Sequence, residues 1–469
     1  MKRILSLALA MLLVLALCAC GEKGGKKKGL QVGFGREEIT PQGPTLIAGG
    51  GNDDRISTDV LDYIYVTCVA ITDAEGNTAL IITQDTVSSS EDFSIQARES
   101  ISKATGVPYE NIIIAATHTH SSGKLLGNAT GSAEFTANYF NKIVVAAQKA
   151  LEDRSPATAY MGNTKAEDLV FVRRYVLEDG TVQGARGNNS TATKVVGHVW
   201  DANETLQIVR FVREAKDKKD ILLTNLGAHA TFNGATTKTS ISADYPAGIR
   251  DYVEYNADCL VAHFIAAAGD QTPTTDIQSE KHRMNYFAYG ERIGELICEY
   301  LPNLQPVAEG SIRVATQTLT AQSKKDDLSK VDEAKQLWEL FQKEGFAVAE
   351  KAAKEAGYAG IYDARAVVNH ASLPATRDII GTVIALGDMA FTAMPYEMHG
   401  GSSAELLQGS AFGEKTFVIT CANGAEGYIP DQRGYDIGTY EAYTSYVVPG
   451  SGEQLVDMYL GMLSEVKGS

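Results

Sequence analysis

The sequence contains few histidines, few cysteines and few basic residues for its length. There are eight histidines and six cysteines among 469 residues, and 42 Lys and Arg stand against 58 Asp and Glu, which gives a formal net charge of −16. A chain with this balance cannot assemble a basic face of useful size, which argues against nucleic acid as a partner. It also disfavours electrostatic adhesion to anionic lipid. Because histidine is scarce, any close pair of histidines is informative.

The cysteines give no sign of a disulfide framework or a zinc cluster. Four of them lie far apart in apolar runs without a CxxC pair: Cys68, Cys259, Cys298 and Cys421. This pattern predicts buried free thiols. With 44% hydrophobic residues, a chain of this length can bury a core that needs no disulfide or structural metal. The length corresponds to two or three ordinary domains, or to one large α/β unit.

The N-terminal segment reads as an export signal. A short basic start, residues 1–3, precedes an apolar run over residues 4–19, which is too short to span a bilayer as a stable helix. The run ends in Leu-Cys-Ala-Cys-Gly, which resembles a bacterial lipoprotein cleavage box. The small residue before Cys20 favours Cys20 as the lipidated residue, with Cys18 as the second choice. The alternative is a plain secreted protein with two unrelated cysteines.

This interpretation divides the chain into three parts. Residues 1–19 would be the signal peptide, residues 20–29 the lipidated cysteine and a flexible basic tether, and residues 30–469 the folded body. The protein would then be exported and lipid-anchored in the bacterial cell envelope. Whether the anchor lies in the inner or the outer membrane stays open.

Strand-like and helix-like patterns alternate loosely through the body, without a repeat. β-rich runs cover residues 62–72, 78–84, 111–116, 205–212, 221–226, 259–268, 310–320, 381–393 and 416–420. Helical periodicity covers residues 91–105, 134–153, 245–255, 285–300, 328–356 and 452–466, of which 328–356 is expected as one long inserted helix. The glycines at 33–35 and 49–51 are expected in turns. The pattern predicts an α/β fold with a mixed β-sheet, or two sheets, covered by helices.

Chemically active side chains collect where the apolar runs end. Open α/β sheets place their sites just beyond the carboxyl ends of strands. Five runs end next to such residues: His118 and His120, His229, Asp270, Glu397, and Tyr428. The sequence therefore predicts one convergent site.

The pair His118 and His120 is the sharpest feature. In an extended segment, residues two apart point to the same face, so both imidazoles can share a metal, or one can bind it while the other faces substrate. Two imidazoles and a carboxylate suit Zn²⁺, whose open position activates water. The alternative is two surface histidines whose hydroxyl neighbours form local turns. We expect His198 and His263 in the core, and His282, His370 and His399 facing solvent.

Six short motifs occur in an order that carries a family resemblance. They are VGFGREEITP at 32–41, THTHS at 117–121, GAHAT at 227–231, SADYP at 242–246, AGDQTP at 268–273 and MPYE at 394–397. The chain thereby resembles the catalytic domain of the neutral/alkaline (non-lysosomal) ceramidases, from about residue 30 to near the C-terminus. The resemblance implies a single large catalytic domain that hydrolyses an N-acyl amide with one zinc ion.

The same resemblance implies roles for individual residues. The zinc ligands would be His118, His229, Glu397 and Tyr428, with Tyr435 as the alternative tyrosine. Tyr440 stands twelve residues beyond Tyr428, as a second tyrosine does in the family. His120 and Tyr440 are the candidate catalytic residues: both could stabilise the oxyanion, and His120 could also protonate the leaving nitrogen. Thr272 stands where the family's GDxSP motif has a serine, while Asp270 is expected to order its loop.

Departures from the family motif leave the substrate open. After the THTHS motif the ceramidases continue with a Gly/Pro-rich stretch, which residues 122–126 lack. The substrate is therefore expected to be ceramide or another lipid-like N-acyl compound, with an ester, lactone or peptide-like bond as the alternative. A non-enzymatic surface-binding lipoprotein with a relic site is the third possibility. Arg173 and Arg174 could clamp a carboxylate or phosphate of a smaller substrate, or form an edge-strand pair with solvated guanidinium groups.

Overall fold

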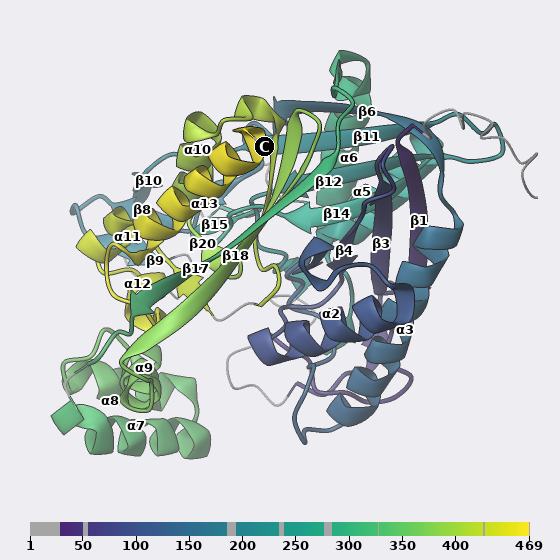
Figure 1. The fold of residues 1–469 in the computed structure, drawn as a ribbon. Coiled ribbons are helices and arrows are strands. Elements are labelled where there is room, and N and C mark those ends of the chain that lie inside the picture. The colour runs from purple at the N-terminus through teal and green to yellow at the C-terminus, as the bar shows by residue number, and fades with distance from the viewer. Residues whose placement is uncertain are drawn as a thin grey trace, which may run out of the picture.

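The structure is a computed structural model that describes residues 29–49, 55–184, 194–233, 239–275, 284–326, 328–424 and 427–468. The predicted signal peptide, Cys18, Cys20 and His282 lie outside the described residues. Within the described part, no helix is both long and apolar enough to cross a bilayer. The expected α/β class is confirmed: two β-sheets pack face to face, and helices cover their outer faces (Figure 1).

The larger sheet is mixed, as predicted. Its strand order is β14-β12-β11-β6-β1-β3-β4-β5, with β16 paired to β6. The β4–β5 and β12–β14 pairs are parallel, and the others are antiparallel. The strands are β1 (Gln31–Glu38), β3 (Tyr65–Thr72), β4 (Thr78–Gln84), β5 (Ile112–Ala116), β6 (Ser155–Lys165), β11 (Thr205–Arg213), β12 (Asp220–Leu226), β14 (Cys259–Ile265) and β16 (Gln305–Pro306).

The smaller sheet packs its inner face on the larger one. It has the order β17 (Ile312–Gln322), β18 (Thr376–Leu386), β19 (Met389–Ala393), β21 (Thr416–Ile419). A hairpin at Gly387 joins β18 and β19, and β19 pairs with β21 in parallel. Ile113 and Phe264 of the larger sheet share one core cluster with Phe391 and Phe417 of the smaller sheet. Burying each such side chain contributes roughly 1.5–3 kcal/mol, so this common core holds the two sheets together as one unit.

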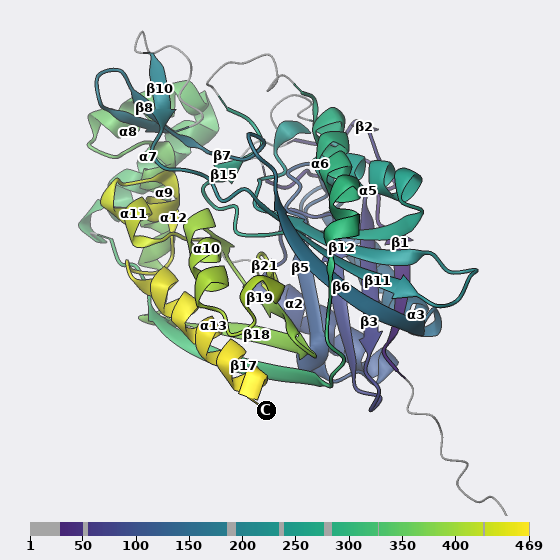
Figure 2. The same cartoon turned by 90° about the horizontal axis from the view of Figure 1, so that it is seen from above.

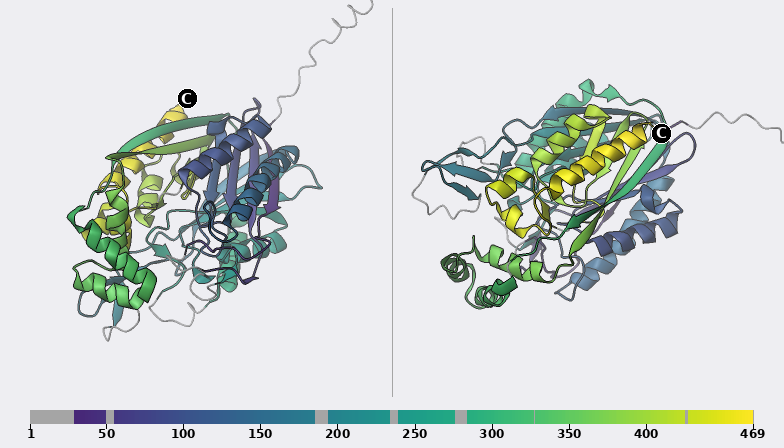
Figure 3. Two further views of the ribbon diagram at one scale, coloured as in Figure 1. Left: turned by 90° about the horizontal axis from the view of Figure 1, so that it is seen from below. Right: turned by 60° about the vertical axis from the view of Figure 1, so that its left-hand side comes forward.

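Helices form the outer layers (Figures 2 and 3). On the larger sheet, one pair packs over β3, β4 and β5 and another over β11, β12 and β14. A third pair covers the smaller sheet. In that order the pairs are α2 (Glu91–Thr105) with α3 (Ser132–Glu152), α5 (Tyr245–Asn256) with α6 (Tyr286–Tyr300), and α10 (Gly400–Gly409) with α13 (Ser451–Gly468).

The glycines at 33–35 lie in strand β1, so the expected turn there is wrong. A Cβ added to Gly33 would lie 2.1 Å from the carbonyl oxygen of Ala150, and one added to Gly35 would lie 2.1 Å from that of Ala146. Both carbonyls belong to helix α3. These glycines therefore allow α3 to pack directly on the strand backbone.

The expected insertion lies between β17 and β18, but it is not one long helix. It consists of η4 (Leu328–Lys330), α7 (Val331–Glu344), α8 (Phe346–Glu355) and α9 (Ile361–Ala371). The three α-helices share an apolar cluster of their own. Gly345, with φ of +84°, separates α7 from α8. Helical periodicity continues across this residue, while its left-handed backbone ends the first helix. Figure 1 shows the insertion projecting from one end of the molecule.

Short elements complete the fold. The strand pairs are β2 (Asp59–Val60) with β13 (Ser240–Ile241), β7 (Phe171–Val172) with β15 (Gln271–Thr272), and β20 (Glu397–Met398) with β22 (Tyr428–Ile429). A three-stranded sheet comprises β8 (Arg174–Leu177), β9 (Val182–Gly184) and β10 (Val195–His198). The short helices are η1 (Tyr109–Asn111), η3 (Leu301–Asn303), η5 (Gly413–Lys415), α11 (Gln432–Asp436) and α12 (Tyr440–Thr444).

Candidate metal centre

The loops that follow the five strands hydrogen-bond to one another. The amide of Ala116, the last residue of β5, donates to the carbonyl of Cys421 after β21. The His120 amide donates to the carbonyl of Ala230 after β12, and the Gly269 amide after β14 donates to the carbonyl of Met398. The strand exits therefore meet at one place, as their sequence positions predicted.

His118 is held by a backbone carbonyl on one side and faces a carboxylate on the other. Its Nδ1 lies 2.6 Å from the carbonyl oxygen of Val87, and its Nε2 lies 3.1 Å from Oε2 of Glu397. The backbone is not extended here, because φ is +64°. A side chain in this left-handed region costs about 1–3 kcal/mol, a strain that is common at functional sites. The expected geometry of the histidine pair is thus wrong, although the two rings still meet.

The other two histidines are oriented in the same way. His229 places Nδ1 2.6 Å from the carbonyl oxygen of Ala268 and Nε2 3.1 Å from Oε2 of Glu397. His120 places Nδ1 2.7 Å from the carbonyl oxygen of Gly49 and Nε2 3.3 Å from Nε2 of His118. Because a carbonyl accepts a hydrogen bond, each Nδ1 carries the proton and each Nε2 is left to act as a ligand.

These spacings fit a zinc-like ion. Ligands about 2.0–2.1 Å from a tetrahedral zinc lie roughly 3.4 Å from one another. The contacts of Glu397 Oε2 with Nε2 of His118 and of His229 are both 3.1 Å, close to that value. His118, His120 and His229 also offer nitrogen atoms that all lie within 4.8 Å of one another. The described residues therefore include a cluster that can hold a metal ion.

Tyr428, rather than Tyr435, reaches this cluster. In the β20–β22 ladder Tyr428 is the register partner of Glu397, so the two residues lie side by side. The Tyr428 ring is 6.5 Å from that of His229 and 5.7 Å from that of Tyr440, between ring centroids. The hydroxyl of Tyr435 donates instead to the carbonyl of Val447.

Arg173 and Arg174 clamp a carboxylate, but it belongs to the protein. Both guanidinium groups bind Glu441, at 2.7 and 2.6 Å, and the Glu441 side chain is fully buried. Arg173 Nη2 also donates to the Tyr428 hydroxyl at 3.1 Å and to the carbonyl of Gly269 at 2.6 Å. The alternative of solvated guanidinium groups is therefore wrong, and an internal acid occupies the predicted anion clamp. Sequence reasoning missed Glu441, whose charged partners are distant in the chain.

Asp270 orders its loop, as expected. Its carboxylate accepts hydrogen bonds from the Gly400 amide at 2.7 Å and from the Trp200 indole at 2.9 Å, and it is buried. Thr272 is also buried, in strand β15, with its hydroxyl 3.3 Å from that of Thr274. In the structure both residues support the loop around the cluster.

Burial and the neighbouring charges give the side chains of the cluster different protonation states in the metal-free protein. Burial opposes ionisation of Glu397, but the adjacent His118 holds the pKa of the Glu397 carboxyl well below its usual range. Burial also disfavours the charged form of His118, yet Glu397 raises the pKa of His118 well above 6.5. Burial lowers the pKa of His229 to about 4 and that of His120 well below its usual value. Metal-free protein thus holds an ion pair between His118 and Glu397 beside two neutral imidazoles.

The two tyrosines keep their protons near neutral pH. Burial, and then the charge of Glu397, raises the pKa of Tyr428 well above 10. Burial raises the pKa of Tyr440 to about 12, with Arg173 acting in the opposite direction. Both phenols can therefore donate hydrogen bonds into the site.

The remaining histidines differ in part from expectation. His263 is buried, as predicted for a core residue, and burial lowers its pKa to about 3. His370 and His399 are also fully buried, so their predicted solvent exposure is wrong. Each is paired with an acid, Asp326 and Asp431 respectively. These acidic partners explain how the two histidines are accommodated inside the protein.

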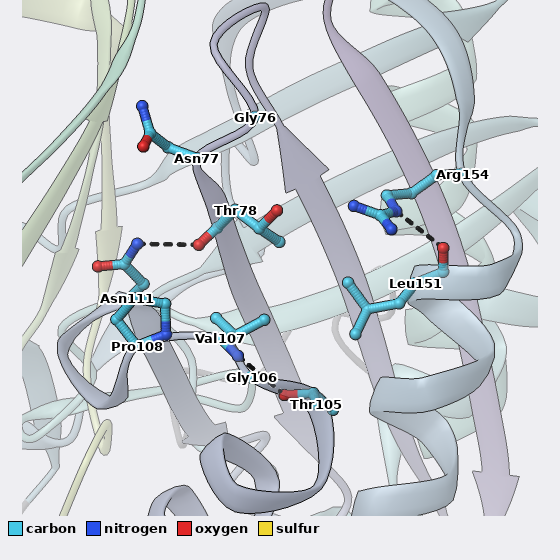
Figure 4. A pocket seen from close by; sticks show the side chains of 10 residues that line it. All are labelled: Gly76, Asn77, Thr78, Thr105, Gly106, Val107, Pro108, Asn111, Leu151 and Arg154. Atoms are coloured by element: carbon cyan, nitrogen blue, oxygen red, sulfur yellow. Dashed lines mark hydrogen bonds between the residues drawn. The ribbon is translucent and has the colours of Figure 1, made fainter. Parts of the chain in front are cut away.

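A pocket of about 300 Å³ lies away from this cluster (Figure 4). It is lined by residues near the start of β4, the end of α2 and the end of α3, including Thr78, Gly106, Asn111 and Arg154. The histidine cluster lies beyond the opposite, carboxyl ends of β4 and β5. The pocket therefore does not form part of the candidate metal centre.

Sequence comparison identifies no relatives: no family model matches this chain, and no curated protein matches it. Comparison with solved structures finds proteins of the same fold. The fold is that of the neutral ceramidases. Neutral ceramidase from Pseudomonas aeruginosa aligns with a TM-score of 0.68 and 14% identity over 93% of this chain and 74% of that chain. A ceramidase complexed with C2 aligns with a TM-score of 0.69 and 14% identity, over 94% and 75%.

At this level of identity the comparison establishes the shared fold. The resemblance carried by the short motifs is thereby confirmed for the architecture.

Proposed function

We propose that this protein is a zinc-dependent hydrolase that cleaves an N-acyl amide bond with water. One observation carries the proposal: Oε2 of Glu397 lies 3.1 Å from Nε2 of both His118 and His229. Two imidazoles and one carboxylate at this spacing match a catalytic zinc site. The shared fold with neutral ceramidases supports an N-acyl amide with a lipid-like chain as the substrate.

One zinc ion would be held by His118, His229, Glu397 and Tyr428. Glu397 contacts both histidines of this set, while His120 reaches the cluster through His118, 3.3 Å away. We assign His120 to proton transfer because the family resemblance implies this role; its 3.3 Å spacing from Nε2 of His118 would also suit a ligand. Zinc, when bound, supplies a Lewis acid for the acyl carbonyl and lowers the pKa of water toward about 7.

The protein side chains supply proton transfer and charge stabilisation. His120 is neutral near pH 7 because burial lowers its pKa, and its Nδ1 is engaged with Gly49. Its Nε2 can then take a proton from the attacking water and give it to the leaving nitrogen. Tyr440 lies beside Tyr428 and keeps its proton, so its hydroxyl can donate to the oxyanion that forms on the acyl oxygen.

Metal analysis combined with substrate profiling tests the proposal. We expect about one zinc per chain in the wild-type protein, with loss of zinc in His118→Ala and Glu397→Gln. His120→Ala should keep its zinc while activity falls about 10²–10⁴-fold. His263→Gln serves as a control, since His263 is a buried histidine hydrogen-bonded to Thr224 in the core. Wild-type protein that binds no zinc would refute the proposal.

A substrate panel identifies the bond that is cleaved. Ceramides and other N-acyl amides should be hydrolysed faster than esters, lactones or peptides with matched acyl groups. Preference for one of the latter would keep the zinc mechanism and change the substrate. Ligand binding that is indifferent to chelators, without turnover of any acyl compound, would instead indicate a binding lipoprotein.

We also propose that the body is anchored in the bacterial cell envelope through a lipid on Cys20. The basic start, the apolar run over residues 4–19 and the Leu-Cys-Ala-Cys-Gly sequence support this. Cys20→Ser should abolish lipid labelling and release the exported protein from the membrane fraction. Cys18→Ser is the matched control and should remain anchored. Labelling lost in Cys18→Ser alone would move the modification to Cys18.

A further inference from the structure

The backbone around His118 is fixed from both sides by threonines. His118 has a φ of +64°, which L residues adopt uncommonly. Its neighbours Thr117 and Thr119 are almost fully buried, at 1% and 0% exposure. Each hydroxyl donates to a partner distant in the chain, 32 positions away for Thr117 and 123 for Thr119, and the Thr119 hydroxyl also accepts a hydrogen bond from the Ser121 amide at 3.3 Å. The local turn considered for these hydroxyl residues is thus present at Thr119, where it accompanies a long-range hydrogen bond.

Thr117 is tied to a buried ion pair. Its hydroxyl donates to Oδ1 of Asp85 at 3.2 Å, and its amide donates to the carbonyl of Gln84 at 2.8 Å. Oδ2 of Asp85 accepts from the Tyr65 amide at 2.9 Å and lies 2.8 Å from Nη1 of Arg250. Asp85 is 1% exposed and Arg250, on helix α5, is 6% exposed. The acceptor of the Thr117 hydroxyl is thus bound to strand β3 and to helix α5.

Thr119 is tied to a different segment. Its hydroxyl donates to the carbonyl of Ser242 at 2.8 Å. The Ser242 amide in turn donates to the carbonyl of Ser121 at 2.9 Å. Ser242 precedes helix α5, whose N-terminus is capped by the Asp244 carboxylate. Both threonines are therefore connected to the same helix, one through Arg250 and one through the segment that starts it.

We propose that Thr117 and Thr119 are positioning residues that hold His118 in its left-handed conformation and direct its Nε2 toward Glu397. The Asp85–Arg250 ion pair is the fixed point of this arrangement. A strained backbone persists only where its surroundings determine it more than once, which the two hydroxyl bonds do. The inference rests on the proposed function, because it concerns how a zinc ligand is presented.

Zinc affinity, measured by competition with a chelator, tests the proposal. Thr117→Val preserves the side-chain volume and removes the hydroxyl, so affinity should fall at least about tenfold. Thr117→Ser restores the donor and should stay within about threefold of wild type. Thr83→Val is the matched control. Thr83 lies in strand β4, and the substitution removes a buried hydroxyl that donates to the carbonyl of His263 at 2.6 Å. That control should bind zinc within about twofold of wild type.

The visible spectrum of cobalt-substituted protein provides a second readout. A displaced His118 should change the intensity of the cobalt bands in Thr117→Val, whereas Thr83→Val should leave them unchanged. Thr119→Val should also lower the zinc affinity and change the cobalt bands. It replaces Thr117→Val as the test variant if Thr117→Val does not fold. Wild-type affinity in both Val variants, or equal losses in Thr83→Val, would overturn the positioning role and leave the zinc site standing. Absence of zinc from the wild-type protein would overturn both proposals.

Discussion

Oε2 of Glu397 lies 3.1 Å from Nε2 of His118, and both side chains are at most 14% exposed. Without a metal this contact is an ion pair, because the carboxylate raises the pKa of His118 well above 6.5. With a metal the same two atoms would become co-ligands. Since zinc binds only the neutral imidazole, the proton on His118 has to leave when the ion binds.

Zinc binding is therefore expected to release about one proton per chain near pH 7. Affinity should rise with pH, up to about tenfold per pH unit below the pKa of His118. Titration calorimetry in two buffers of different ionisation enthalpy measures the released proton directly. A zinc affinity that is constant between pH 6 and 8 would contradict the assignment of His118 as a ligand that is protonated in the metal-free protein and loses its proton when zinc binds.

The same pair predicts how the metal-free protein responds to pH. The folded-state pKa of His118 is raised, so its stabilisation is complete below about 6.5 and is lost as the pH rises through the folded-state value. The folded-state pKa of Glu397 is lowered, so its stabilisation is present above about 4.3 and is lost as the pH falls through the folded-state value. The ion pair thus contributes most between roughly pH 4.3 and 6.5. His118→Gln should remove this contribution.

The two adjacent arginines should have different roles: Arg174 should affect stability alone, and Arg173 should affect both stability and activity. Arg174 binds Glu441 and the carbonyl of Arg173, whereas Arg173 also binds the Tyr428 hydroxyl. Removing one partner of a buried ion pair costs about 3–5 kcal/mol, so Arg174→Met should lower the free energy of unfolding with little change in activity of the folded fraction. Arg173→Met should lower both. Equal activity losses in the two variants, measured beside denaturant unfolding, would contradict this division.

The helical insertion should influence activity through Tyr362. The Tyr362 ring on α9 packs edge-on against Tyr440, with centroids 6.1 Å apart. An aromatic contact of this kind contributes about 0.5–1.5 kcal/mol, so Tyr362→Ala should reduce kcat about two- to tenfold without loss of zinc. Tyr362→Phe should be close to wild type. Tyr255→Ala, at an 87% exposed tyrosine, is the control, and a matching loss there would exclude a specific contact.

Replacing Gly35 should destabilise the fold without acting on the site. A Cβ on Gly35 would lie 2.1 Å from the carbonyl oxygen of Ala146 in α3, so the helix would have to move. Gly35→Ala should lower the free energy of unfolding by about 1–3 kcal/mol, as forced overpacking does. Gly43→Ala places its Cβ in open space and should change stability little. Thermal melts of the two variants provide the comparison.

Local periodicity predicted the elements that depend on it. Helix α2 and strand β4 have the predicted bounds, because the apolar residues of α2 follow the helical period and β4 is a short, continuous, β-rich run that follows a turn. Strand β6 was missed: its buried positions include small residues, such as Ser155, Ala157 and Ala159, which give a weak apolar signal. Gly345 was not recognised as a helix end because the apolar spacing continues beyond it.

The sequence predicted the site residues that come directly after an apolar strand. It did not predict the buried residues whose charged partners are distant in the chain. His118, His229 and Glu397 come soon after apolar strands, so topology alone brings them together. The Arg173–Glu441 pair joins residues 268 positions apart, and nothing near either residue indicates the other. The burial of His370 and His399 likewise depends on acidic partners, 44 and 32 positions away.

A crystal structure of zinc-loaded protein, with anomalous data collected at the zinc edge, tests the central claim most directly. We expect one anomalous peak within about 2.0–2.2 Å of Nε2 of His118, Nε2 of His229 and the Glu397 carboxylate, with the Tyr428 hydroxyl as the fourth protein ligand. A fully loaded protein whose peak lies elsewhere, or that shows no peak among these residues, would contradict it.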